Sequence, residues 1–167
     1  MSHVHPQSTW ISINTCMVCN NKFDEQKLSS FCVPPPPQEK YAKRLSFIVH
    51  CENPACGRAA RKSRRECMSE NNCFYIDNLF PDVEYLIPRS DGGTVSAKIF
   101  DRQLTFIDNA VHMWFGFDGL FKRMPLDVVI KHNSFLKDLD LHLDDEFRED
   151  CPALFEQITQ YMASIQN

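Results

Sequence analysis

Short stretches in which apolar and polar residues alternate predict β-strands with one buried side. In the N-terminal part, residues 8–15 predict a strand that leads into the first cysteine pair, and residues 44–50 predict another that ends at the second pair. The proline run 34–37 lacks backbone donors and predicts a loop. Alanines and long unbranched side chains favour a helix over residues 57–69.

The middle of the chain predicts an antiparallel meander, with strands over 83–88, 94–100, 102–107 and 111–117. The turn cluster 89–93 contains Asp-Gly-Gly, which supplies the positive φ angles of a hairpin. We therefore expect residues 83–88 and 94–100 to pair as neighbours.

Beyond Pro125 the pattern changes, and the apolar residues favour helix: Val128, Val129, Phe135, Leu136 and Leu139. The acidic segment 138–150 predicts a solvated connector; the alternative, a cation or acid–base site, lacks a calcium-loop spacing. Asp150 and Pro152 suit a helix start, with Asp150 as the cap. An amphipathic helix is expected over 152–165.

The composition indicates a folded protein with an uneven charge. The 167 residues are 43% hydrophobic and 24% charged, which excludes global disorder. Residues 1–69 hold ten Lys/Arg and five Asp/Glu, whereas residues 70–167 hold eight and seventeen, so +5 and −9 give the net −4. A basic module in front of an acidic body suggests an acidic partner, although uneven charge also occurs merely as a solubilising feature.

The compartment expected from the sequence is intracellular, either cytoplasm or nucleus, with no membrane partner. Residues 1–15 do not resemble a signal peptide, and no stretch is long and apolar enough to span a bilayer. In a reducing compartment, cysteines persist as thiols or metal ligands. Eight cysteines in this chain therefore favour metal over disulfides.

The strongest chemical signal is the pair Cys16-x2-Cys19 followed by the pair Cys51-x4-Cys56. Two thiolates in a tight turn and two more where a strand gives way to a helix form a tetrahedral Zn²⁺ site. A knuckle, a hairpin and a helix in this order predict a treble-clef zinc finger. The gap of four residues is longer than the usual two, so Asn53 and Pro54 are expected to bulge the turn.

The other cysteines are expected to pack in the core: Cys32, Cys67, Cys73 and Cys151. The alternative is a second metal site formed by Cys67 and Cys73 with Cys32 or His50. His50 is also an alternative ligand at the first site. We favour the interpretation that His50 binds no metal and only ends the strand 44–50.

Cationic residues gather on one face of the predicted helix at i, i+3, i+4 and i+7: Arg58, Arg61, Lys62 and Arg65. A basic face next to a zinc site suits phosphates of nucleic acid or another acidic surface. The alternatives are a solvated face, or arginines paired with the acidic half. The run 58–65 also matches a nuclear-localisation patch.

No nucleophile elbow, P-loop or dinucleotide-binding glycine motif occurs, so no catalytic residue is predicted. The segment 87–93 resembles the centre of the HNH nuclease motif. In that family a histidine that activates water stands where this chain has Tyr85. Without it the general base is missing, and the segment is interpreted as a hairpin turn.

Three features together resemble small zinc-finger proteins of large nucleocytoplasmic DNA viruses: Cys16-x2-Cys19, residues 47–51 with Cys56, and residues 87–92 in a β-region. The resemblance implies a viral protein that acts in an infected cell, near transcription, without an assigned enzymatic activity. It supplies no functional residues beyond the four cysteines.

We therefore expect an α+β protein with an N-terminal treble-clef-like zinc finger, a central antiparallel β-meander and C-terminal helices. Residues 1–69 would form the finger, and residues 70–167 the remainder, packed with the finger as one unit. The expected function is non-enzymatic binding of Zn²⁺ and of nucleic acid or a protein of a nucleic-acid machine. The alternatives are a homodimer formed through residues 111–117 or the final helix, and a degenerate HNH-like nuclease.

Overall fold

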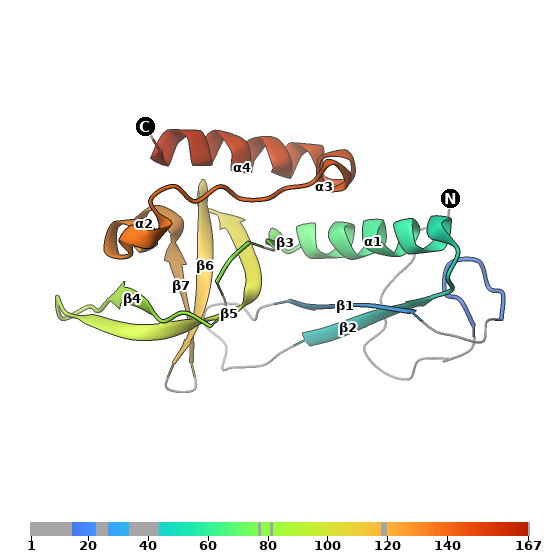
Figure 1. Cartoon of the computed structure of the whole chain (residues 1–167), viewed down its shortest axis with the longest axis horizontal. Coiled ribbons are helices and arrows are strands. Elements are labelled where there is room, and N and C mark those ends of the chain that lie inside the picture. The colour runs from blue at the N-terminus through green and yellow to red at the C-terminus, as the bar shows by residue number, and fades with distance from the viewer. Residues whose placement is uncertain are drawn as a thin grey trace. The chain divides into compact units, whose positions relative to one another are not determined.

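The computed structural model is α+β and has an antiparallel sheet and C-terminal helices (Figure 1). It describes residues 15–22, 27–33, 44–76, 78–80, 82–117 and 120–166. The predicted strand over 8–14 and the predicted loop 34–37 lie outside these residues. Described residues up to Asn71 form one compact unit, and those from Asn72 onward form a second.

The first unit contains a β-hairpin followed by a helix. Strand β1 (Lys27–Val33) pairs antiparallel with β2 (Arg44–His50), and Lys27 lies opposite His50. This confirms the predicted strand at 44–50, whereas β1 was not predicted. Consecutive serines interrupt the alternation of β1 and hide it from pattern analysis.

Helix α1 (Pro54–Ser69) begins three residues before the predicted start. The Asn53 side chain accepts a hydrogen bond from the Ala55 N–H at 2.9 Å, and Pro54 occupies the first helical position, where no amide is needed. The predicted bulge at Asn53 and Pro54 is therefore wrong, because these two residues start the helix.

The described side chains of this unit include one buried apolar cluster. Ile48 and Ala60 are fully buried in it, and Met17 and Val18 pack against them. A unit of this size has little surface to bury and ordinarily relies on an additional cross-link.

The second unit is built on a sheet with strand order β3-β5-β6-β7, and β4 also pairs with β5. All pairs are antiparallel. The strands are β3 (Cys73–Tyr75), β4 (Tyr85–Pro88), β5 (Thr94–Ile107), β6 (Ala110–Phe117) and β7 (Leu120–Pro125).

The expected meander of four strands is corrected in two ways. The segments 94–100 and 102–107 form the single strand β5, whose pairing with β6 shifts register between Ile99 and Leu104. One end of β5 pairs with β4 and the other end pairs with β3, so two different strands lie beside different parts of this one long strand. Strands β3 and β7 were not predicted.

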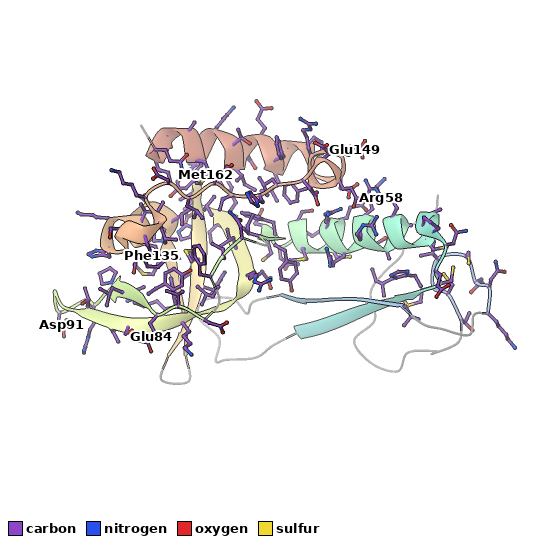
Figure 2. All side chains as sticks on the ribbon, in the orientation of Figure 1. Arg58, Glu84, Asp91, Phe135, Glu149 and Met162 are labelled. Atoms are coloured by element: carbon purple, nitrogen blue, oxygen red, sulfur yellow. The ribbon has the colours of Figure 1, made fainter. Side chains whose placement is uncertain are left out.

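Two turns follow from residues that tolerate positive φ. Asp108 and Asn109 have φ of 53° and 59° and connect β5 directly to β6, as a two-residue hairpin turn requires. Between β4 and β5, Gly92 has φ of 91° and the Arg89 N–H donates to the Gly93 carbonyl at 2.7 Å. The predicted hairpin at 89–93 is thus confirmed, with Asp91 at its tip (Figure 2).

The helices of the second unit follow the sheet. They are α2 (Leu126–His132), the 3-10 turn η1 (Ser134–Leu136), α3 (Asp145–Asp150) and α4 (Pro152–Ile165). The final helix is confirmed at 152–165, but its cap is Cys151 rather than Asp150, which ends α3. Asp144 caps α3 by accepting from the Phe147 N–H at 2.8 Å. None of the described helices combines the length and the apolar character of a membrane span.

One core joins the sheet to these helices. Leu154, Ile158 and Met162 of α4 are buried against strand residues that include Val111 and Met113 (Figure 2). Strand β6 lies between β5 and β7, and residues 111–115 are all buried. Within the described residues, β6 therefore has no open edge on which a further strand could add, and the homodimer stays a prediction.

A buried asparagine links α2 to β4. The side chain of Asn133 accepts from the Leu86 N–H at 2.8 Å and donates to the carbonyls of Leu86 and Val129 at 2.9 and 2.8 Å. It is almost fully buried, so these bonds satisfy backbone groups that packing hides from water.

We expect Asn133→Ala to lower the free energy of unfolding by about 2 kcal/mol, because it leaves backbone groups of Leu86 without their partner. Urea denaturation followed by circular dichroism measures this change. The matched control is Ser134→Ala at the exposed neighbouring position, which should change stability by less than about 0.5 kcal/mol. Equal effects of the two substitutions would contradict the assigned role of Asn133.

Candidate metal centre

The first cysteine pair lies on a tight turn. The Asn20 N–H donates to the Cys16 carbonyl at 2.9 Å, and the Cys16 N–H donates to the Asn21 carbonyl at 2.9 Å. Asn20 has φ of 66°, a conformation that asparagine tolerates better than most residues. The turn directs the Cys19 N–H toward the Cys16 Sγ at 3.5 Å, as in a metal-binding knuckle.

The second pair lies where β2 ends and α1 begins. Cys51 directly follows β2, and Cys56 is the third residue of α1, with its N–H bonded to the Asn53 carbonyl at 2.9 Å. Side chains in a helix tilt toward its N-terminus, so the Cys56 thiol is directed back toward Cys51. The spacing of four residues is accommodated because Asn53 and Pro54 start the helix.

The structure brings these four predicted cysteines together. The Sγ atoms of Cys16, Cys19, Cys51 and Cys56 all lie within 4.8 Å of one another. Cys16 and Cys56 are buried, Cys51 is half-buried and Cys19 is exposed. The Met17 N–H donates to the Val49 carbonyl at 2.9 Å and holds the knuckle against β2.

The thiols of the cluster differ in acidity. Burial raises the pKa of Cys16, but backbone hydrogen bonds from Cys19, Cys51 and Val18 outweigh it and lower this pKa from 9.0 to about 6. Burial raises the pKa of Cys56, and hydrogen bonds with the other thiols raise it further. Cys16 is therefore the thiol of the cluster that loses its proton most readily. Four thiolates this close to one another repel unless a cation lies among them.

The distance between the Cys19 and Cys51 sulfurs fits tetrahedral coordination of one metal. Ligands about 2.3 Å from a Zn²⁺ ion stand about 3.8 Å apart. The Sγ atoms of Cys19 and Cys51 are 3.9 Å apart, which is also far longer than a disulfide bond. Four cysteines that are compatible with metal binding are therefore present in the first unit.

The part of the chain that the structure describes contains no second group of three or more such ligands. Cys73 is buried with its Sγ 3.6 Å from the Thr105 Oγ1, and burial raises its pKa. Cys151 belongs to the core of the second unit. His50 places its Nδ1 3.0 Å from the Cys51 carbonyl and lies outside the cluster. The side chain of Cys32 is not among those described.

The four predicted cationic residues share one face of α1. Arg58, Arg61 and Arg65 are half-buried, and Lys62 is 54% exposed with its Nζ 3.9 Å from the Glu66 carboxylate. Figure 2 marks Arg58 on this helix, near the end that carries Cys56. These positions confirm the helical spacing on which the predicted basic face depends, while their ligand stays a prediction.

An open cavity of about 420 Å³ lies beside the cluster and was not foreseen from the sequence. It is lined by residues of β2, the cap and α1, among them His50, Asn53 and Arg61. A Cβ at Gly57 would lie 3.4 Å from the Arg61 Nη1. The sequence feature that could have indicated this cavity is Gly57, a glycine in the first turns of a helix rich in cations.

The structure also describes the two other candidate segments. The Tyr85 ring is buried, its hydroxyl donates to the Phe80 carbonyl at 3.1 Å, and burial raises its pKa. It is therefore unsuited to replace the histidine of an HNH nuclease. The segment 138–150 is an extended connector followed by α3, as the solvated interpretation requires.

Comparison of the chain with protein-family models, with curated proteins and with solved structures found no match. The resemblance to viral zinc-finger proteins therefore stays a prediction.

Proposed function

We propose that this chain is a non-enzymatic zinc protein in which Cys16, Cys19, Cys51 and Cys56 hold one Zn²⁺ ion. The observation that carries the proposal is the convergence of four Sγ atoms within 4.8 Å. All four ligand positions are filled by sulfur, which is the set of a closed structural site rather than of a catalytic one. The knuckle, hairpin and helix then constitute a treble-clef finger.

Zinc is favoured over other metals by the donor set and the expected role. Four thiolates suit Zn²⁺ or iron, and a purely structural site has no use for the redox chemistry that iron has and Zn²⁺ lacks. A stabilising role is supported by the origin of the four cysteines, since the ion would connect the knuckle, the end of β2 and the start of α1.

The finger serves, in this proposal, to present α1 to nucleic acid. Its four cations at i, i+3, i+4 and i+7 form a positive stripe. Contacts between such cations and phosphates carry no sequence information, so binding would be independent of sequence. The unit that carries α1, residues 1–35 and 42–71, holds nine Lys/Arg and five Asp/Glu, a formal charge of +4. This sign favours a polyanion.

The reduced chain, purified without chelators, is expected to contain one Zn²⁺ per chain by elemental analysis. Substitution of Cys19 by Ser should reduce this content severely, because it removes one of four ligands. Cys67→Ser on α1, outside the cluster, is the matched control and should keep the metal. Zinc-free protein would contradict the proposed site.

Metal removal should unfold the first unit and spare the second. In Cys19→Ser, or after addition of a strong chelator, amide resonances of residues 15–22 and 44–71 should collapse to random-coil positions, because zinc binding is coupled to folding. Resonances of α4 should stay dispersed, since α4 and its packing partners both belong to the core of the second unit. An unchanged spectrum for residues 44–71 would show that a metal does not organise this unit.

A quadruple variant with Gln at Arg58, Arg61, Lys62 and Arg65 should weaken nucleic-acid binding almost equally for all sequences. Each cation that no longer pairs with a phosphate should flatten the slope of log K against log salt by about one unit. Fluorescence anisotropy with labelled DNA and RNA at several salt concentrations measures both effects. Zinc content should not change, because none of the four is a ligand.

The competing explanation is that these cations pair with carboxylates of the acidic half. The quadruple variant should then lose stability without a binding phenotype. Failure of the unmodified protein to bind any DNA or RNA at low salt, where the electrostatic attraction is strongest, would overturn the nucleic-acid proposal and leave the zinc site intact.

A further inference from the structure

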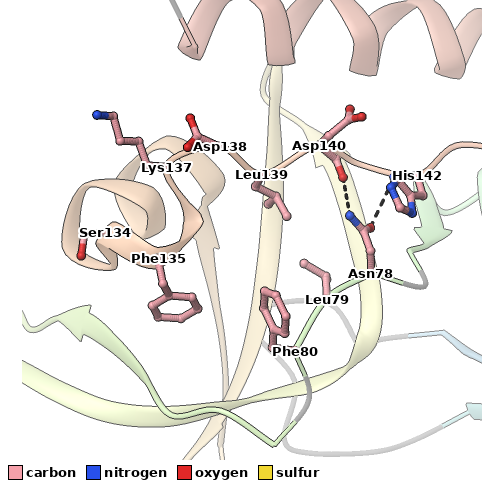
Figure 3. A pocket seen from close by; sticks show the side chains of 10 residues that line it. All are labelled: Asn78, Leu79, Phe80, Ser134, Phe135, Lys137, Asp138, Leu139, Asp140 and His142. Carbon is pink, nitrogen blue, oxygen red and sulfur yellow. Dashed lines mark hydrogen bonds between the residues drawn. The ribbon is translucent and has the colours of Figure 1, made fainter.

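The second unit contains an open pocket between the loop after β3 and the turn η1 (Figure 3). Its volume is about 560 Å³, within the range of roughly 300–1,000 Å³ that ligand sites occupy. The apolar part of its lining comes from Leu79, Phe80, Phe135 and Leu139. All of its residues belong to one unit, so the pocket does not depend on the zinc finger.

Two aromatic rings stand exposed in this pocket. Phe80 is 48% and Phe135 50% exposed, and their ring centroids are 6.2 Å apart in an edge-to-face arrangement. Figure 3 shows the rings next to each other, with Leu139 directed toward Phe80. Neighbouring exposed phenylalanines are unfavourable in water and mark a surface that a ligand covers.

The buried Tyr85 connects both phenylalanines to the core. It donates its hydroxyl to the Phe80 backbone carbonyl, and its ring centroid is 5.5 Å from that of Phe135. The Phe135 ring and the Phe80 backbone are therefore positioned before a ligand binds, which lowers the entropy cost of binding.

The opposite rim of the pocket is polar and acidic. Asp138 and Asp140 are exposed on the extended segment 137–144, and Figure 3 shows their carboxylates directed away from the rings. The Asn78 amide donates to the Asp140 carbonyl and accepts from the His142 N–H at 3.3 Å. The segment is thus fixed, with leucines inward and carboxylates outward.

A second open cavity continues along the same segment. Its volume is about 490 Å³, it shares Asp140 and His142 with the first, and it adds Asp144 and Phe155. The two cavities, whose linings together include residues 137–144, are called the groove below.

The negative charge around the groove indicates that its ligand is positively charged. Residues 72–167 hold eight Lys/Arg and sixteen Asp/Glu, a formal charge of −8, and Lys137 is the one Lys or Arg among the residues that line the two cavities. A phosphate-bearing ligand would be repelled, whereas a basic peptide would be attracted. An apolar side chain fits the rings, and basic neighbours reach the carboxylates.

From these observations we infer that the groove binds a partner protein through a short basic segment with one large apolar anchor. The anchor inserts against Phe80 and Phe135, and flanking Lys or Arg side chains pair with Asp138 and Asp140. The inference goes beyond the proposed zinc and nucleic-acid functions and requires neither.

The probe is a fluorescein-labelled synthetic peptide in which one phenylalanine stands between pairs of lysines, titrated with the full chain and followed by anisotropy. We expect saturable binding that falls at least tenfold for Phe135→Ser. It should fall to a similar degree when the peptide phenylalanine is replaced by serine. Asp138→Asn combined with Asp140→Asn should weaken binding severalfold and reduce its salt dependence, because flanking charges then lack partners.

Leu86→Ser is the matched control, since Leu86 is 46% exposed but does not line the pocket, and it should leave binding unchanged. Should Phe135→Ser fail to fold, chemical-shift changes in the unmodified chain decide the question, and they should centre on Asn78, Phe80, Phe135 and Asp140. Equal affinity of the phenylalanine and serine peptides, shifts located elsewhere, or no binding at millimolar peptide would overturn the inference.

Discussion

The meeting of four cysteine sulfurs is the constraint on which the first unit depends. Cys16 and Cys19 come from a knuckle, Cys51 from the end of a strand and Cys56 from the first turn of a helix, and the sulfurs lie within 4.8 Å. These three segments are distant in the sequence, and a unit of this size ordinarily needs a cross-link to hold such segments together. The second unit differs, because a continuous apolar core joins its sheet to its helices.

The sequence predicted the cysteine cluster well because spacing and chemistry agree, but it predicted the local backbone less well. Pro54 was expected to bulge the turn, whereas it occupies the first helical position, where proline is favoured. The polar residue Asp101 separated the two predicted strands 94–100 and 102–107, although β5 continues through it while its partners change. Pairing between distant segments decided the extent of β5, and a local pattern does not contain that information.

The aromatic pocket could be predicted from the local sequence pattern even less than the extent of β5. Phe80 and Phe135 are separated by 55 positions in the sequence and come from a loop and a 3-10 turn, so neither periodicity nor spacing connects them. The pairing of β4 with β5 and the hydrogen bonds of Asn133 to Leu86 bring their two segments together. Asp138 and Asp140 were interpreted from the sequence as merely solvated, because their apolar neighbours across the pocket were not visible.

The two charged surfaces differ in how binding should respond to salt. The cations of α1 form a stripe on a helix whose exposed face is polar, so attraction to phosphates is mainly electrostatic and declines steeply as ions screen it. The acidic groove also offers two aromatic rings, and burial of an apolar anchor persists when charges are screened. Binding at the groove should therefore survive ionic strengths that release nucleic acid from the helix. One chain would then keep a protein partner while it exchanges a nucleic-acid partner, which suits an adaptor more than a permanent structural subunit.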